Sequence, residues 1–276
     1  MADEYTLAAV RAAVTVSARL GLPGHPPEVL HERSNVLVGL GPLVARVPAT
    51  TRLLRPDATP WLARDVAVSR FLTERGVLVV SPTTDPPAGP HFADGLPVTL
   101  WHRTRHDPDH RYAPDVVARS LAELHSALRE FPGELPRRGP LDDLERLLSL
   151  NGGAMDGAAP RLAAEAARIE AGLPAAAVQP LHGDAHPGNL IATEAGPCWL
   201  DFEDTWRGPL AWDLGILARQ GGPEYLAAYP GSFDEAAVEA FTELRQLFAV
   251  AWRFAIAQRF PHRLPEARAA LADYFS

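Results

Sequence analysis

The chain has 276 residues, of which 47% are hydrophobic and 22% charged, a balance typical of a folded globular protein rather than a disordered one. Its formal net charge of -8 excludes a general affinity for nucleic-acid backbones or anionic membrane surfaces. The single cysteine, Cys198, excludes an internal disulfide and is typical of a reducing compartment, so we expect a cytoplasmic protein.

Targeting and membrane signals are not predicted. The N-terminal stretch MADEYTLAAVRAAV places acidic residues before its apolar run, which is wrong for a secretory signal. The most apolar late stretch, LFAVAWRFAIA, is interrupted by Arg253 and is too short to span a bilayer. The 26 residues counted as Lys+Arg are all arginines, so a kinase of this sequence must do without the usual phosphate-binding lysine.

The first part of the chain is predicted to be rich in short strands. Hydrophobic patterning predicts helices over 7–20 and 60–75 and strands over 28–31, 36–40, 43–47, 77–80 and 98–101. Gly76 stands just past the second helix, where a C-cap glycine belongs. A Pro- and Gly-rich loop over 81–97 separates the last two strands.

After the strand at 98–101 the chain becomes mainly helical. A charged, His-rich connector over 102–110 precedes helices predicted over 114–130, 141–150, up to about 172, 210–219, 234–257 and 264–274. A short strand over 178–181 and a hairpin of 190–192 with 198–202 interrupt them. We therefore expect an α+β fold with two lobes: a small β-rich lobe over 1–101 and a larger, mainly helical lobe over 102–276. Ligands commonly bind in the cleft between two such lobes.

The densest group of polar residues lies in LHGDAHPGNLIATEAGPCWLDFED, residues 181–204. Asp184 is followed five residues later by Asn189, and the predicted hairpin then returns the chain to Asp201. Phosphoryl transfer requires one carboxylate that faces the attacking hydroxyl and oxygen ligands that hold a divalent metal on the nucleotide phosphates. An amide and carboxylates suit Mg²⁺. Glu203 is either a further carboxylate of this metal site or a solvated side chain.

HGDAHPGN followed by LDFED resembles the motif pair of the aminoglycoside phosphotransferase family, whose fold is similar to that of protein kinases and choline kinases. The resemblance implies that Asp184 is the catalytic base and that Asn189 and Asp201 are the Mg²⁺ ligands. It also implies that His182 braces the catalytic loop and that His186 contacts the γ-phosphate. Asp213 would be the buried aspartate that ties the following helix to the catalytic loop.

The N-terminal lobe resembles the family more loosely. SNVLVGLGPLVARVP, which begins with Ser34 and Asn35, is similar to the family's phosphate loop and to the strand that bears its nucleotide-binding base. The resemblance places Arg46 where lysine is commonest, and an arginine keeps a permanent charge that can contact two phosphate oxygens. Asp65 aligns with the helix glutamate that usually pairs with this base. VTLWHR, with Trp101 and His102, resembles the hinge that binds adenine through its backbone.

We therefore predict a kinase that uses Mg²⁺ and ATP or GTP to phosphorylate a small hydroxyl-bearing molecule. One alternative is a catalytically degenerate, nucleotide-binding module of the same fold, which the loss of lysine favours. A second is a metallohydrolase, since His182, Asp184 and His186 also resemble a compact metal-ligand cluster. Because the C-terminal helices mix acidic and basic residues, an aminoglycoside, a sugar and an amino alcohol all remain candidate acceptors.

Overall fold

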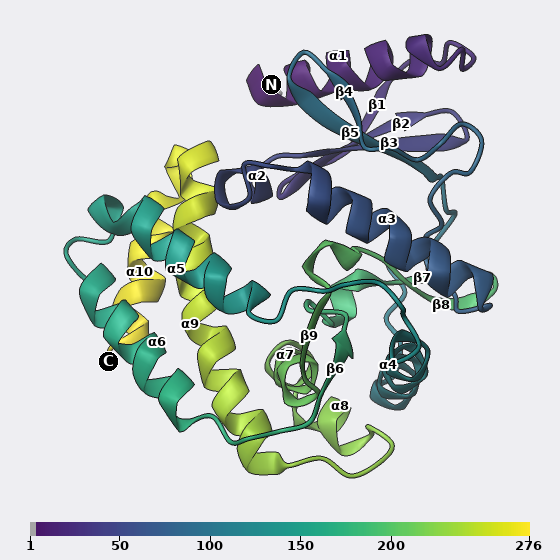
Figure 1. Ribbon diagram of the computed structural model, residues 1–276. Helices are drawn as coiled ribbons and strands as arrows, with labels where there is room; N and C mark the ends of the chain where they lie inside the picture. Colours follow the sequence, from purple (N-terminus) through teal and green to yellow (C-terminus); the bar gives the residue numbers. More distant parts are fainter. Residues whose placement is uncertain (1–3) are drawn as a thin grey trace. The chain divides into compact units, whose positions relative to one another are not determined.

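The computed structural model describes residues 4–276, and the chain divides into two compact units (Figure 1). The first unit contains the residues up to His110 together with Ile191–Glu203, and the second contains Arg111–Leu190 with Asp204–Ser276. The predicted α+β class is confirmed, with a sheet in the N-terminal part and mainly helices in the C-terminal part. The packing of Ile191–Glu203 with the N-terminal unit was not predicted.

A five-stranded antiparallel sheet forms the centre of the first unit. Its strand order is β1-β2-β3-β5-β4, and the bounds in that order are Glu28–Glu32, Asn35–Leu40, Leu43–Pro48, Leu96–His102 and His91–Ala93. The hairpin between β2 and β3 pairs Leu40 with Leu43, so the turn is made by the Gly-Pro pair between them. A glycine and a proline supply the backbone conformations that a tight turn needs.

Helix α1 (Glu4–Arg19) covers one face of this sheet, and α3 (Thr59–Glu74) lies on the other side (Figure 1). The core under α1 combines side chains at helical spacing with alternate residues of the strands: Ala9, Ala12, Ala13, Val16, Val36, Val38, Ala45, Val47, Val98 and Leu100. The helical period and the strand period both match the prediction for these segments. A short helix, α2 (Thr51–Leu54), connects β3 to α3.

The segment 77–80 was predicted as a strand, and this prediction is wrong. Only Val79 pairs, with Trp199, through hydrogen bonds from Val80 N to Trp199 O (2.9 Å) and from Trp199 N to Leu78 O (3.0 Å). Trp199 ends the hairpin of β7 (Leu190–Thr193) and β8 (Gly196–Trp199). Because β4 already pairs with the outer edge of β5, the segment meets this hairpin instead of extending the sheet.

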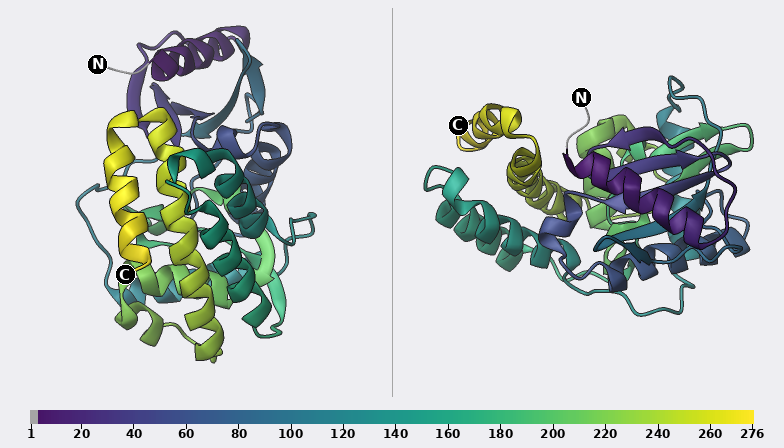
Figure 2. Two further views of the ribbon diagram at one scale, coloured as in Figure 1. Left: turned by 90° about the vertical axis from the view of Figure 1, so that its left-hand side faces the viewer. Right: turned by 90° about the horizontal axis from the view of Figure 1, so that it is seen from above.

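The second unit is mainly helical and is organised around one long helix. Its helices are α4 (Pro114–Leu128), α5 (Gly139–Asn151), α6 (Ala159–Gly172), α7 (Ala211–Gly221), α8 (Pro223–Ala227), α9 (Glu235–Arg259) and α10 (Leu264–Tyr274). α9 packs against α5, α6, α7 and α10, and Figure 2 shows α10 alongside it. The predicted helices are confirmed; α2, α8, β4 and β9 are too short for periodicity to predict.

Two short strands of the second unit flank the polar motif. β6 (Val178–Leu181) leads into it and pairs antiparallel with β9 (Trp206–Pro209), which follows it.

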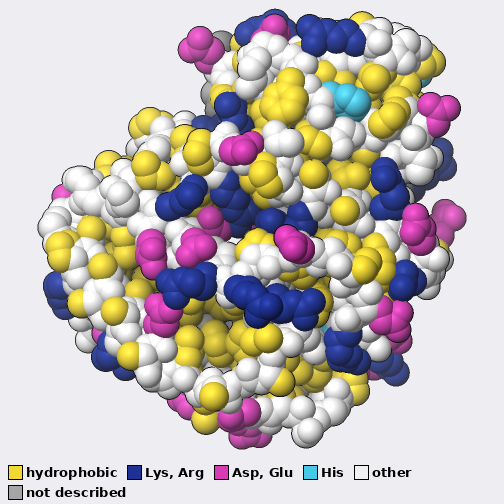
Figure 3. Space-filling model, viewed as in Figure 1, with side chains coloured by type: hydrophobic (Ala, Val, Ile, Leu, Met, Phe, Trp, Pro, Cys, Tyr) yellow, Lys and Arg dark blue, Asp and Glu magenta, His cyan; other side chains and the backbone are white. Residues whose placement is uncertain are grey.

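None of the described helices combines the length and apolar character that crossing a bilayer requires. Acidic and basic side chains are interspersed over the face seen in Figure 3, so the net charge of -8 is not gathered there into one acidic surface.

Candidate active site

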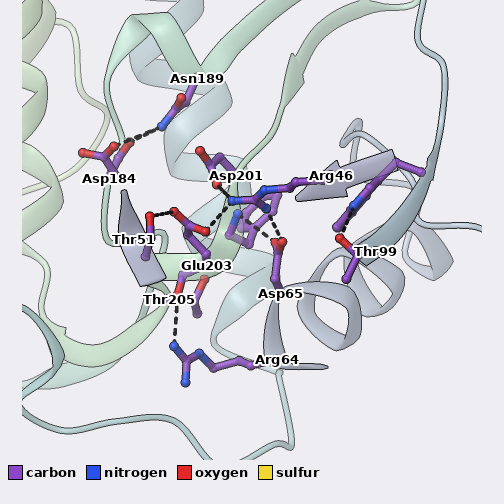
Figure 4. A network of polar contacts seen from close by, with 12 residues as sticks. Arg46, Thr51, Arg64, Asp65, Thr99, Asp184, Asn189, Asp201, Glu203 and Thr205 are labelled. Atoms are coloured by element: carbon purple, nitrogen blue, oxygen red, sulfur yellow. Dashed lines mark hydrogen bonds and ion pairs between the residues drawn. The ribbon is translucent and has the colours of Figure 1, made fainter. Parts of the chain in front are cut away.

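Arg46 is the centre of a buried cluster of charges in the first unit (Figure 4). It lies on β3 between two fully buried residues that belong to the core under α1, so strand alternation turns its side chain toward α3. There the guanidinium, whose side chain is 7% exposed, forms ion pairs with Asp65, Asp201 and Glu203. Arg46 therefore connects α3 to the segment that follows the β7–β8 hairpin.

The ion pair between Arg46 and Asp65 is the pairing that the sequence predicted. Burial would lower the pKa of Arg46, but the charges of Asp201, Glu203 and Asp65 outweigh it and raise that pKa above its usual value. Burial, opposed by the charge of Arg46, raises the pKa of Asp65 to about 6. The arginine is thus held permanently charged, while Asp65 protonates at mildly acidic pH.

Asn35 begins β2, and Ser34 precedes it in the β1–β2 turn, beside this cluster. In the orientation that satisfies both of its amide atoms, Asn35 accepts from Arg46 Nη2 at 3.0 Å through its side-chain oxygen. The carbonyl of Ser34 accepts from the N–H groups of Ala49 and Thr50, both at 3.0 Å. These bonds hold the β1–β2 turn against the end of β3, near Arg46. The sequence predicted that Ser34 and Asn35 would accompany this arginine.

Asp201 adopts a left-handed backbone conformation, with φ of 71°. Such a conformation costs an aspartate about 1–2 kcal/mol, and tertiary contacts must offset that cost. The next residue, Phe202, donates its N–H to Asp65 Oδ1 at 3.1 Å, which fixes the turn. Asp201 remains 28% exposed, whereas the side chains of Asp65 and Glu203 are 0% and 6% exposed. Asp201 is therefore the carboxylate of the cluster best presented to a soluble cation.

Glu203 is buried and hydrogen-bonded. It is therefore not a solvated side chain, which was one of the two possibilities that the sequence left open. Its Oε1 accepts from Thr51 Oγ1 at 3.1 Å. Its main-chain carbonyl accepts from Arg55 at 3.2 Å and from Arg64 at 3.0 Å. The sequence did not predict these three partners, because they lie on α2, α3 and the turn between them, more than a hundred residues before the motif.

Trp101 and His102 occupy the end of β5, as the hinge resemblance requires. Trp101 is buried and donates from its indole nitrogen to Thr99 Oγ1 at 2.9 Å, while the side chain of His102 is exposed. The N–H of His102 donates to Ser81 O at 3.0 Å. That N–H is thus already bonded within the unit.

In the second unit, Asp213 fixes the loop that follows β6. It lies in the first turn of α7 and is fully buried. Its carboxylate accepts from the N–H groups of His182 at 2.9 Å and Gly183 at 3.0 Å. His125 Nε2 lies 2.9 Å from the same carboxylate, and its Nδ1 lies 3.0 Å from the hydroxyl of Tyr229. The contact of Asp213 with the loop backbone is the one that the family resemblance implied.

Gly183 is the residue at which this loop packs against the backbone of Asp204. Its φ is 90°, and a Cβ atom built there would lie 2.0 Å from the carbonyl oxygen of Asp204. Trp212 donates from its indole nitrogen to Gly183 O at 2.8 Å, so the loop cannot move aside without losing that bond. Only glycine therefore fits at this position.

We expect Gly183→Ala to lower the free energy of unfolding by several kcal/mol, because it adds both a clash with backbone and a left-handed conformation. Chemical denaturation with linear extrapolation measures the change. Gly153→Ala is the matched control, since a Cβ there meets nothing within 4 Å. Equal stability of the two variants would contradict the loop geometry.

Asp184 is the next residue of the loop and is ion-paired with Arg245 of α9. His182 Nδ1 accepts from the N–H of Asp184 at 3.3 Å, and the His182 side chain is fully buried, consistent with a brace. Burial would raise the pKa of Asp184, but the charge of Arg245 and the hydrogen bond from His186 outweigh it and hold that pKa well below its usual range. Asp184 is therefore a carboxylate anion at neutral pH. Arg245 was not predicted to contact it, because the two residues are far apart in the sequence.

His186 and Asn189 complete the loop. His186 Nδ1 accepts from Gly188 N at 3.0 Å, which leaves Nε2 as the protonated nitrogen, 3.5 Å from Asp184 Oδ2. The amide nitrogen of Asn189 donates to Asp184 at two points, to the main-chain carbonyl at 2.9 Å and to Oδ2 at 3.3 Å. Figure 4 shows these two side chains directed toward each other.

The donor atoms that were expected to hold Mg²⁺ fit that ion. Because the amide nitrogen of Asn189 is committed to Asp184, the amide oxygen is the atom that it offers to a cation. Asp201 offers the most exposed carboxylate of its cluster. Among residues 4–276, no three His, Cys, Asp or Glu side chains are grouped as a metal site. Mg²⁺ is usually held by one or two protein oxygens plus substrate phosphates and water, so such a group is not required.

The comparisons with known proteins identify a family and a fold. The model of the phosphotransferase enzyme family matches residues 26–254. No curated protein sequence matches the chain. Among solved structures, the amicoumacin kinase hAmiN, in complex with AMP-PNP, Ca²⁺ and Ami, has a TM-score of 0.67 at 12% identity, covering 93% of this chain and 92% of that one.

Two further structures have similar folds. APH(2'')-IIIa in complex with GDP and kanamycin has a TM-score of 0.64 at 16% identity, over 95% of this chain and 97% of that one. A choline/ethanolamine kinase family protein from Mesorhizobium loti has a TM-score of 0.60 at 18% identity, over 95% and 94% of the two chains. At these identities the likeness establishes the fold.

Proposed function

The chain belongs to the phosphotransferase enzyme family, and we propose that it is a Mg²⁺-dependent kinase that transfers the γ-phosphate of ATP or GTP to a hydroxyl of a small molecule. Family membership makes it a small-molecule phosphotransferase. The nucleotide, the metal and the acceptor, whether an aminoglycoside, a sugar or an amino alcohol, are the proposed parts.

The observation that carries the proposal is the constrained loop around Asp184. Asp213 holds the loop backbone, Asn189 contacts Asp184 at two points, and the pKa of Asp184 lies below its usual range. An ionised carboxylate at a fixed position can orient an acceptor hydroxyl and take its proton. The hydroxyl oxygen then bonds to the γ-phosphorus, the bond to the bridging oxygen breaks, and the nucleoside diphosphate leaves.

In this proposal the nucleotide binds to residues 1–101 and the chemistry belongs to residues 102–276. Arg46, held by Asp65 and joined by Ser34 and Asn35, contacts nucleotide phosphates. Trp101 and His102 contact the base, and His186 contacts the γ-phosphate. Asn189, Asp201 and Glu203 would hold Mg²⁺, which when bound would neutralise charge on the transferring phosphoryl group.

One observation favours the degenerate nucleotide-binding module as a second candidate. The carboxylate of Asp184 is occupied by Arg245. A protein that only binds nucleotide would not need Asp184 to be released. The metallohydrolase alternative is disfavoured, because the side chain of His182 is fully buried and braces Asp184 instead of facing a ligand.

Transfer of radiolabelled γ-phosphate tests the proposal. We expect phosphorylated product from ATP or GTP with at least one acceptor among aminoglycosides, sugars and amino alcohols, and we expect EDTA to abolish it while excess Mg²⁺ restores it. Nucleotide binding without any transfer would favour the degenerate module. Activity that survives EDTA would contradict the metal-dependent mechanism.

A further inference from the structure

Arg245 begins a strip of side chains that leads away from Asp184 along α9. Phe248 and Trp252 follow it at the third and seventh positions, so all three lie on one side of the helix, and both rings are partly buried. The Cζ atom of Arg245 lies 5.0 Å from the centroid of the Phe248 ring. The rings of Phe248 and Trp252 stack with centroids 6.4 Å apart and planes inclined by 15°. A guanidinium and two stacked rings thus adjoin the proposed catalytic base.

The ion pair with Asp184 leaves Arg245 incompletely satisfied. Its Nη2 contacts Asp184, but its Nε–H is buried and has no hydrogen-bond acceptor among the described residues. A buried donor without an acceptor costs about 1–3 kcal/mol. Nε and Nη2 of a guanidinium form a parallel pair of donors that matches the two oxygens of a carboxylate or phosphate group. A bidentate oxyanion would therefore satisfy Arg245 better than Asp184 does.

The surroundings of Arg245 disfavour a polycation. Burial, and then the charges of Arg245 and Arg253, lower the pKa of Arg219 on α7, so three guanidinium groups act on one another in this region. Arg253 is balanced by Glu266 at 3.4 Å. An acceptor with several amino groups would add like charge beside these arginines, whereas an anionic group would balance them.

We infer that the acceptor carries an oxyanion group, a carboxylate or a phosphate, together with an apolar ring, and that this group takes Arg245 away from Asp184. The ring packs on Phe248 and Trp252. Release of Asp184 leaves it free to take the proton of the acceptor hydroxyl as the oxygen–phosphorus bond forms and the nucleoside diphosphate departs. The inference rests on the proposed function and names the substrate class of that site.

A matched set of acceptors tests the inference. 4-(Hydroxymethyl)benzoate, 1,4-benzenedimethanol and 4-(aminomethyl)benzyl alcohol share a ring and a hydroxyl but carry a negative, neutral and positive group. We expect kcat/KM for the benzoate to exceed that of the neutral compound by about tenfold or more, with the cation lowest. 4-(Hydroxymethyl)phenyl phosphate separates a phosphate from a carboxylate. A preference for the cation, or for kanamycin, would overturn the inference.

Arg245→Gln identifies the residue responsible. We expect this variant to lose the preference for the anion by about tenfold, chiefly through KM, while Arg259→Gln, on the same helix, keeps it. Calorimetric binding of 4-methylbenzoate, which has no hydroxyl, reports the anion site without chemistry, and Arg245→Gln is expected to weaken it about tenfold. Unchanged preference and unchanged binding in Arg245→Gln would reject the anion site.

The two measurements separate this inference from the proposed function. Binding of 4-methylbenzoate that depends on Arg245, with no phosphoryl transfer to any acceptor, would reject the kinase proposal and keep the anion site. Transfer to neutral or cationic acceptors alone would reject the anion site and keep the kinase proposal.

Discussion

Asp184→Asn is expected to lower kcat for phosphoryl transfer by about 10²- to 10⁴-fold, the usual contribution of a positioned general base. The substitution keeps the volume of the side chain and an oxygen that accepts from Arg245, but it removes the group that takes the proton. Nucleotide affinity should change little, whereas the thermal unfolding midpoint should fall, because the new amide nitrogen cannot accept from Asn189 as Oδ2 does. Steady-state kinetics, nucleotide titration and thermal denaturation measure the three quantities.

Asp156→Asn is the matched control for this substitution. Its carboxylate is also ion-paired with an arginine, Arg268, but is 63% exposed and lies outside the loop. We expect wild-type kinetics from the control. Unchanged turnover in Asp184→Asn would remove Asp184 from the chemistry. A large loss of nucleotide affinity would assign it a binding role instead.

Arg46→Ala should cause a large loss of stability. It removes the cation that Asp65, Asp201 and Glu203 share, and two of those carboxylates are almost fully buried. Removing one partner of a buried ion pair typically costs about 3–5 kcal/mol, because the remaining charge is left unpaired. If Arg46 also contacts nucleotide phosphates, we expect nucleotide affinity to fall at least tenfold. Denaturant unfolding and nucleotide titration measure these effects.

Two control variants separate charge from position at Arg46. Arg46→Lys keeps a cation but loses the forked geometry, so it should recover part of the stability. Arg119→Ala removes an exposed ion pair with Asp115 and should change the free energy of unfolding by less than about 1 kcal/mol. A destabilised Arg46→Ala variant with unchanged nucleotide affinity would make Arg46 structural only.

The sequence alone determined the order of the main elements and the polar motif. The core under α1 alternates along β2 and repeats at helical spacing along α1, so local periodicity was sufficient to predict both. Asp184 and Asn189 lie five residues apart on one loop, and their contact follows from that short separation. Segment 77–80 shows what local patterning cannot predict. Its pattern fits a strand, but whether a strand forms depends on pairing partners that lie elsewhere in the chain.

Only the tertiary structure decided which distant residues complete the site. Arg46 meets Asp201 and Glu203 across more than 150 intervening positions, and Arg245 meets Asp184 across about sixty. No local period links such residues; the first pair of contacts forms because Ile191–Glu203 folds into the same unit as β3, and the second forms in the unit where α9 packs against α7. The chain therefore encodes its phosphoryl-transfer motif locally. The ion pairs that Arg46 and Arg245 make with residues of that motif form only when each unit has folded, because buried charges acquire counterions through packing.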